Sequence, residues 1–256
     1  MKFDIIKIIL LILIIFINVL LNIIKKISNN RIADINYKNK YLSTHNTDMI
    51  STKPKYINSS RDYWENRYKH GGNSGVGSYN NLAAFKAKVI NNFVIEKNIN
   101  TVLELGSGDC NQLSYANYKN YFGYDVSKTA IDICKQKFNY DKTKTFIYLD
   151  ENYKIQQKVD LSISLDVIFH LVEDNVFNLY MKKLFESSYR YVYIYSNNIE
   201  KKASGHVRFR KFTVWIEKYV SDKWKLIKFI PNQFPQDPNN VLYTSFSDFY
   251  FYEKIK

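Results

Sequence analysis

The chain has 256 residues, 46% of them hydrophobic and 16% aromatic, which is enough for a packed core and excludes a wholly disordered protein. Its two cysteines, Cys110 and Cys134, form no CxxC pair, so we expect no disulfide framework, no zinc cluster and a reducing compartment. The net charge of +13 fits nucleic acid, anionic membrane or acidic substrates alike, and codon bias towards Lys explains it equally well.

The N-terminal segment, residues 3–24, is almost entirely aliphatic and long enough to span a bilayer. A cleaved signal peptide is the alternative, but the segment ends in "NIIKK" rather than in small residues. The sequence therefore predicts an uncleaved single-pass anchor at residues 1–24. The following basic residues outweigh the preceding ones, so we expect the rest of the chain in the cytoplasm; they are Lys25, Lys26 and Arg31 against Lys2 and Lys7.

Residues 25–60 are polar, rich in Asn, Lys, Ser and Thr, and without a sustained hydrophobic period. This composition is typical of a linker next to a membrane. Residues 61–256 then have the length of one α/β domain.

Helix and strand patterns alternate through this domain. Helices are predicted at 82–93, after the capping residue Ser127, and at 176–185, and short strands at 102–105, 121–124, 146–149, 161–165 and 191–195. Such alternation predicts a doubly wound α/β fold with a mostly parallel sheet and helices on both faces. Two last strands, 224–230 and 246–252, have no helix between them and predict a terminal antiparallel hairpin.

The stretch "TVLELGSGDCNQL" follows the first predicted strand and carries the main motif. Gly106 and Gly108 allow a tight turn and a close approach to a ligand, and Asp125 ends the next strand, where an acid can accept hydrogen bonds from ribose hydroxyls. The spacing predicts a nucleoside-containing cofactor. The alternatives are a plain tight turn at the glycines and a helix-capping role for Asp125.

A dinucleotide site usually has a third glycine, where this chain has Asn111, and here an acid, Glu104, precedes the first glycine by two residues. The arrangement from Glu104 to Asp109 resembles the first motif of the class I S-adenosylmethionine-dependent methyltransferases, with Cys110 in place of a small residue. The resemblance covers roughly residues 62–253. It implies a Rossmann-like seven-stranded sheet and S-adenosylmethionine as the cofactor, held by Glu104, Gly106, Gly108 and Asp125.

Three further segments resemble the same family. "LSISLDVIFHLVED" resembles its fourth-strand segment and implies that Asp166 borders the cofactor and that His170 is a candidate general base, with a core histidine as the alternative. "DYWENRYKHGGNSGVGS" resembles the aromatic helix and glycine-rich lid of a bacterial subset, which implies cofactor contacts for Trp64 and Arg67, the latter with the methionyl carboxylate. "SGHVRFRKFTVWIEKY" resembles a segment after the fifth strand; its alternative is a solvated basic face around His206.

The favoured function is a membrane-anchored methyltransferase acting on a small-molecule, sugar or other polar acceptor without a metal ion. A noncatalytic module with the same fold, tethering partners to a membrane, is the alternative from another class, and a nicotinamide oxidoreductase is a further one. Asp166 is followed by Val167, Ile168 and Phe169 rather than by an NPPY-type tetrapeptide, which argues against a nucleic-acid acceptor.

Overall fold

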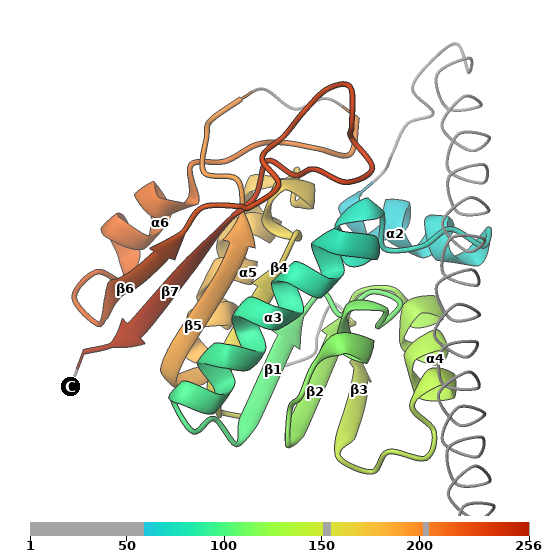
Figure 1. The fold of residues 1–256 in the computed structure, drawn as a ribbon, viewed down its shortest axis with the longest axis horizontal. Helices are drawn as coiled ribbons and strands as arrows, with labels where there is room; N and C mark the ends of the chain where they lie inside the picture. The colour runs from blue at the N-terminus through green and yellow to red at the C-terminus, as the bar shows by residue number, and fades with distance from the viewer. Residues whose placement is uncertain (1–58, 151–154, 202–204, 256) are drawn as a thin grey trace, which may run out of the picture. The chain divides into compact units, whose positions relative to one another are not determined.

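The computed structural model of the chain describes residues 59–150, 155–201 and 205–255 (Figure 1). The membrane anchor predicted at residues 1–24 and almost all of the linker predicted at 25–60 lie outside these residues. Among the helices that are described, none combines the length and the apolar composition needed to cross a bilayer.

A seven-stranded sheet forms the centre of the domain (Figure 1). In spatial order its strands are β3 Lys144–Tyr148, β2 Asn120–Asp125, β1 Thr101–Leu105, β4 Val159–Leu165, β5 Ser188–Ser196, β7 Asp248–Lys254 and β6 Trp224–Ile230. The first five are parallel, and β7 pairs antiparallel with both β5 and β6. The predicted mostly parallel sheet with a terminal hairpin is therefore confirmed.

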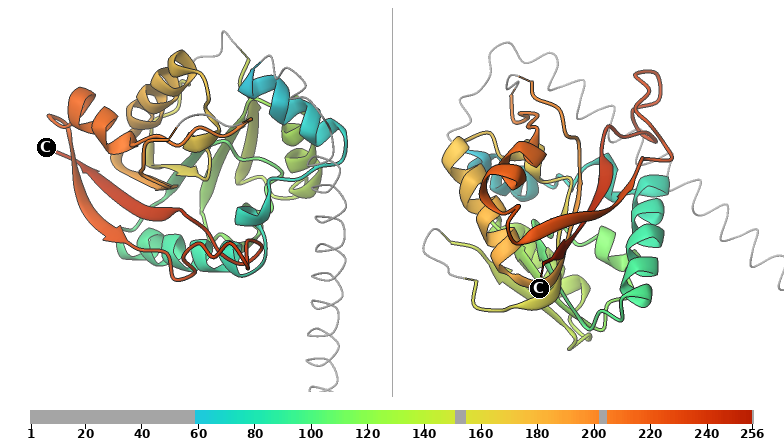
Figure 2. Two further views of the ribbon diagram at one scale, coloured as in Figure 1. Left: turned by 90° about the horizontal axis from the view of Figure 1, so that it is seen from above. Right: turned by 90° about the vertical axis from the view of Figure 1, so that its left-hand side faces the viewer.

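Helices cover both faces of the sheet (Figure 2). Helices α3 Asn80–Glu96 and α4 Lys128–Lys137 share one buried apolar cluster with the sheet, and α5 Asp174–Glu186 and α6 Phe212–Tyr219 share the other. Helix α6 was not predicted, although Phe212, Trp215 and Ile216 have the spacing of a buried helical face. Its eight residues follow a basic run that gives no helix signal.

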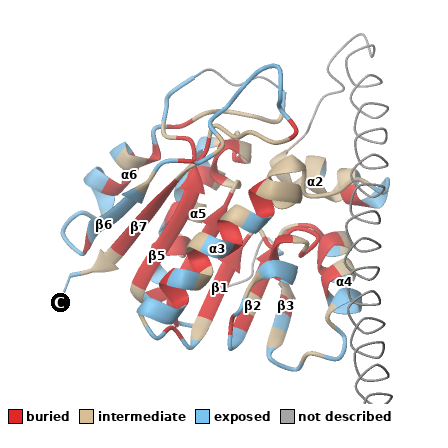
Figure 3. Ribbon diagram, in the orientation of Figure 1, coloured by how far each residue is buried: buried red, intermediate tan, exposed pale blue. Residues whose placement is uncertain are grey.

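The central strands are buried on both faces, whereas the edge strand β6 is largely exposed (Figure 3). On β5 the side chains alternate: Tyr191, Tyr193 and Tyr195 pack in the α3 cluster, and Val192 and Ile194 pack in the other. Burial on both faces explains the continuous apolar and aromatic run 191–195 of β5, whereas β4 alternates apolar residues with buried polar ones, Asp160, Ser162 and Ser164.

The strand order reverses at β1, whose neighbours β2 and β4 lead to opposite ends of the sheet. In open α/β sheets this switch point, at the carboxyl ends of the strands, is where ligands bind. Here α2 Ser60–Lys69 and the 3-10 turn η1 Val76–Ser78 lie against the loops that leave β1 and β2. We call residues 60–79 the lid.

Candidate functional site

The loop after β1 turns sharply at its two glycines, Gly106 with φ +88° and Gly108 with φ +55°. A side chain at Gly106 would lie 2.5 Å from a methyl of Val167, and one at Gly108 would collide with the Ser74 hydroxyl of the lid. Both positions thus require glycine for backbone conformation and for space. The hydroxyl of Ser107, between them, is buried and has no hydrogen-bond partner among the described residues.

Asp125 ends β2 and holds this loop from the side. Its carboxylate accepts hydrogen bonds from the backbone N–H of Gly108, at 2.9 Å, and of Ser127, at 2.8 Å. Burial raises the pKa of Asp125 to about 6, against the opposing effect of the backbone hydrogen bonds. Asp125 does not cap α4, because Ser127 is the N-cap residue and its hydroxyl accepts from the Ala130 N–H; Asp125 instead ties the glycine loop to the start of α4.

Glu104 lies on β1 with only 4% of its surface exposed. Its carboxylate accepts a hydrogen bond of 2.5 Å from the Tyr121 hydroxyl of the neighbouring strand. Burial raises the pKa of Glu104 to about 7, while Tyr121 and the charge of Lys86 act in the opposite direction. A buried acid that titrates near neutral pH is suited to respond to a charged ligand.

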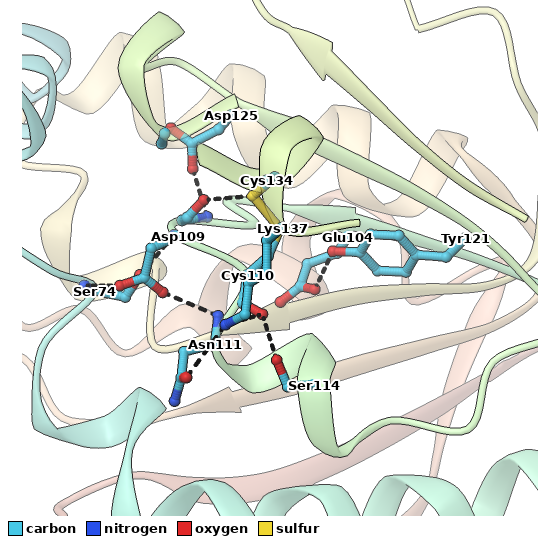
Figure 4. The surroundings of a disulfide bond; sticks show 12 residues. Ser74, Glu104, Asp109, Cys110, Asn111, Ser114, Tyr121, Asp125, Cys134 and Lys137 are labelled. Atoms are coloured by element: carbon cyan, nitrogen blue, oxygen red, sulfur yellow. Dashed lines mark hydrogen bonds between the residues drawn. A yellow bond between two sulfur atoms is a disulfide. The ribbon is translucent and has the colours of Figure 1, made fainter. Parts of the chain in front are cut away.

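The lid is joined to the glycine loop by hydrogen bonds (Figure 4). Asp109 accepts from the Ser74 N–H at 2.9 Å and from the Tyr79 hydroxyl at 2.7 Å, and its own N–H donates to the Ser74 hydroxyl at 2.9 Å. On α2, Glu65 accepts from the hydroxyl of Ser127 at 2.6 Å. The lid thus contacts both loops of the switch point.

Trp64 and Arg67, the two residues predicted from the lid segment, lie on α2. The Arg67 guanidinium donates to the carbonyl of Asn73 at 2.7 Å and lies 5.7 Å from the Trp64 ring. Arg67 therefore fixes the glycine-rich turn of the lid. Its predicted contact with a methionyl carboxylate stays a prediction.

His170 ends the 3-10 turn η3 Ile168–His170, after β4, and lies in a cluster of rings. Its ring stacks with that of His206, with centroids 5.3 Å apart, and meets the edge of Trp64 at 4.8 Å. Tyr63 stacks on the other side of His206 at 4.1 Å. The structure therefore brings together three segments that sequence analysis selected separately.

Burial lowers the pKa of the His170 imidazole to about 3, with smaller contributions in the same direction from His206 and Arg67. The imidazole is consequently neutral near physiological pH, so one ring nitrogen is available to accept a proton. With so low a pKa, however, it is a weak base. Its role as a general base stays a prediction, and so weak a base can remove only a proton that is itself strongly acidic.

Asp166, the predicted residue at the end of β4, has a positive φ of 58°, which is uncommon for a residue other than glycine. Its carboxylate accepts from the Lys86 ammonium at 2.8 Å and from the Ser247 hydroxyl at 2.8 Å. On the lid side, a Cβ at Gly77 would lie 2.5 Å from the Asp166 oxygen. Asp166 is thus fixed between α3, the segment before β7 and the lid.

The expectation that the cysteines form no disulfide is contradicted, because Cys110 and Cys134 are bonded to each other (Figure 4). They are separated by 24 residues, with Cα atoms 5.5 Å apart. The pairing arises because the loop after β1 packs on α4, the helix that follows the adjacent parallel strand. Sequence spacing alone carries no sign of that proximity. The described residues include no cluster of three His, Cys, Asp or Glu side chains able to hold a metal ion.

No family model matches the sequence, and no curated protein matches it. Among solved structures, the N-methyltransferase NodS from Bradyrhizobium japonicum, in complex with S-adenosylhomocysteine, aligns with a TM-score of 0.56 at 10% identity, over 75% of this chain and 99% of that chain. Magnesium protoporphyrin IX methyltransferase ChlM from Synechocystis, with bound S-adenosylmethionine, aligns with a TM-score of 0.55 at 16% identity, over 80% of this chain and 99% of that chain. The methyltransferase domain of a bacterial Hen1 gives 0.52 at 18% identity, over 68% and 100%. The chain has the class I methyltransferase fold.

Within this methyltransferase fold, several site residues were missed by sequence analysis. They are Glu65, Ser74, Lys86 and Ser247; Asp109 belongs to the motif of the glycine loop, but its bonds to the lid were not expected. A usable signal existed for Lys86 alone, because a lysine interrupted an apolar helical face. The alternative of a solvated basic face is wrong for Arg210, which is only 6% exposed and bonds to Asp174 at 2.7 Å and to two backbone carbonyls.

Proposed function

We propose that the protein is an S-adenosylmethionine-dependent methyltransferase. The observation that carries this proposal is the glycine loop of β1, closed on one side by Asp125 and on the other by the lid. Solved structures of the same fold that hold S-adenosylmethionine or its product support it.

The residues present fit this cofactor. Gly106 and Gly108 supply the positive φ angles that let the loop turn at the end of β1, and the unpartnered hydroxyl of Ser107 lies between them. Asp125 would accept hydrogen bonds from the ribose hydroxyls, and Glu104 and Asp166 would balance the positive charge of the methionyl end. Trp64 and Arg67 would cover that end from the lid.

The cofactor supplies an activated methyl group on a positively charged sulfur. The protein's contribution is then mainly to align the acceptor and exclude water, which can supply about 7 to 11 kcal/mol of the barrier. His170 and Trp64 would border the acceptor at the end of β4. A weakly basic imidazole can still take the proton of a hydroxyl acceptor, because the oxygen that receives the methyl group becomes a strongly acidic oxonium as the bond from methyl to sulfur breaks.

We further propose a small polar molecule or a glycan as the acceptor. Around His170, four positions after Asp166 in the chain, the rings of Tyr63, Trp64, Phe169 and His206 form a compact aromatic cluster. A flat aromatic surface next to a hydrogen-bond acceptor suits a ring that carries hydroxyl or amine groups.

Calorimetric titration of the purified protein with S-adenosylmethionine, S-adenosylhomocysteine and NAD tests the cofactor. Binding of the first two without NAD is expected, and binding of NAD alone would favour an oxidoreductase. Incubation with labelled S-adenosylmethionine and a panel of sugars and polar metabolites then tests catalysis. Cofactor binding without transfer to any acceptor class, including membrane extracts, would favour the noncatalytic tethering module.

The proposed location is a membrane, with a single anchor at residues 1–24 and the catalytic domain in the cytoplasm. The aliphatic composition of residues 3–24 and the lysines that follow support it. The protein should then resist carbonate extraction. Glycosylation of an acceptor site engineered at the C-terminus would contradict the cytoplasmic orientation.

A further inference from the structure

Lys86 is the one charged residue on the buried face of α3, and its side chain is fully buried. A lysine is almost never buried completely unless it is paired, because removing an ammonium group from water is costly. Its partner is Asp166, at 2.8 Å, and the Tyr195 ring lies 5.0 Å from its nitrogen. Neither sheet packing nor helix formation needs a charge at this position, so the pair has a role other than packing.

The partner of Lys86 is unusual in its backbone. Asp166 has a φ of 58°, a conformation that costs energy for a residue with a side chain, and such residues gather at functional sites. Its carboxylate is held from two directions, by Lys86 and by Ser247, and its side chain remains 16% exposed. Lys86 therefore fixes a partly open carboxylate at the carboxyl end of β4, directly under Gly77 of the lid.

A second acid, Glu104, lies on the same face of the sheet as α3: its hydrogen-bond partner Tyr121 packs in the α3 cluster, whereas Leu103 and Leu105 on either side of it pack in the other cluster. The charge of Lys86 lowers the pKa of Glu104, against the burial that raises it. The other ionisable groups that interact with Glu104 are Tyr118, Tyr121, Asp125 and Tyr180. The three tyrosines have pKa values raised by burial and stay neutral, and Asp125 adds only negative charge. Lys86 is thus the cation that counters the negative charge of Glu104.

We propose that Lys86 is a positioning residue of the cofactor site: its ammonium holds the Asp166 carboxylate beneath the lid and supplies the counter-charge of Glu104, so that both acids are in place for a cationic ligand. This inference rests on the proposed function, because S-adenosylmethionine carries a positive sulfur. The two acids would thus be balanced by two positive charges, the sulfonium of the bound cofactor and the buried ammonium of Lys86.

The test is the pH dependence of S-adenosylmethionine binding between pH 5.5 and 9.5, measured for the full chain by calorimetry. In the wild type, affinity should increase with pH until Glu104 is ionised, near pH 7. In Lys86→Met the midpoint should move upwards by about 1 to 3 pH units, as expected for an acid that loses a nearby opposite charge. Lys86→Arg should restore the midpoint, and S-adenosylhomocysteine, which lacks the sulfonium charge, should show a smaller dependence.

Lys88→Met is the matched control, since Lys88 is exposed on the same helix and should leave the midpoint unchanged. If Lys86→Met does not fold, the double variant Lys86→Met with Asp166→Asn removes both charges of the pair and should fold. Glu104 still lacks its counter-charge in this double variant, so the midpoint of the pH dependence should stay above that of the wild type. An unchanged midpoint in a folded variant without Lys86 overturns the inference. Failure of the wild type to bind S-adenosylmethionine at any pH overturns instead the proposed function.

Discussion

Ser74 and Asp109 exchange two hydrogen bonds: the Ser74 N–H donates to the Asp109 carboxylate, and the Asp109 N–H donates to the Ser74 hydroxyl, each at 2.9 Å. One residue lies in the lid and the other directly follows Gly108. The lid is therefore bonded directly to the loop that we propose holds the cofactor. The contact links the stability of the lid to the rate at which a ligand leaves.

Asp109→Ala should accelerate cofactor release. It removes the acceptor of the Ser74 N–H and of the Tyr79 hydroxyl, which costs about 1 to 3 kcal/mol. We expect the dissociation rate, measured by stopped flow, to increase about 10-fold or more, together with faster hydrogen exchange in residues 60–79. Asp132→Ala, at an exposed position on α4, is the control. An unchanged dissociation rate would show that the contact does not limit release.

Asp125→Ala should weaken the affinity for the cofactor, in contrast to Asp109→Ala, which should mainly accelerate its release. The variant loses the carboxylate that holds the Gly108 N–H and that we expect to receive the ribose hydroxyls. A loss of about 1 to 3 kcal/mol corresponds to a dissociation constant raised about 5- to 150-fold. Calorimetry measures this, with circular dichroism to confirm folding. Full wild-type affinity in a folded variant would place the ribose elsewhere.

Glu104 should make the ligand-free protein less stable as the pH rises. Its pKa is about 7 in the folded state, against an ordinary value of 4.5 for a glutamate in the unfolded chain, so between these values the folded chain retains a proton that the unfolded chain has lost. The free energy of unfolding should therefore be highest below pH 4.5, as far as this residue is concerned, fall up to about pH 7, and level off above it. The full loss is about 3 kcal/mol, at about 1.4 kcal/mol per pH unit.

Denaturant unfolding at several pH values, on wild type and Glu104→Gln, measures this slope. The amide keeps a group that accepts from the Tyr121 hydroxyl but cannot ionise, so the decrease between pH 5 and 7 should become shallower in the variant. Identical slopes in the two proteins would show that another group titrates, with Asp125, whose pKa is raised to about 6, as the next to replace.

The sheet, its order of helices and strands and the glycine loop were predictable because each rests on local sequence. The alternating apolar pattern of β4, the aromatic run of β5 and the glycines after β1 have direct backbone consequences. Asp125 followed from its position at the carboxyl end of β2, whereas Glu104 and Asp166 followed from the resemblance to the class I methyltransferases. These features do not depend on which distant segments meet.

Contacts between distant segments were not predictable from one sequence. Ser247 reaches Asp166 across 81 positions, and the backbone of the lid reaches Asp109 across 35, through polar residues that look like ordinary loops. Arg210 had the appearance of a surface residue because only the fold places it on buried carbonyls. Whether such a polar residue belongs to the site depends on which distant segment it contacts in the fold, and composition does not show this.

The Cys110–Cys134 disulfide should stabilise the domain measurably. It closes a loop of 24 residues, for which about 2 to 4 kcal/mol is typical. Reductant should then lower the melting temperature of the wild type by about 5 to 15 °C, and should leave a Cys110→Ser, Cys134→Ser double variant unaffected. Thiol titration of the unreduced, denatured protein should find no free thiol. Two free thiols would show that the cysteines are reduced in the purified protein.

The role of His170 is decided by separating turnover from cofactor affinity. His170→Gln keeps a polar side chain next to Trp64 and His206 but cannot accept a proton, so turnover of an identified acceptor should fall about 100- to 10,000-fold. Cofactor affinity and melting temperature should stay close to those of the wild type. Because the pKa of His170 is lowered to about 3, wild-type activity should show no loss from protonation of this ring down to about pH 5.

His70→Gln, at the exposed end of α2, is the matched control. A parallel decrease of stability, affinity and turnover would instead identify His170 as a packing residue, and unchanged turnover would exclude it as the base.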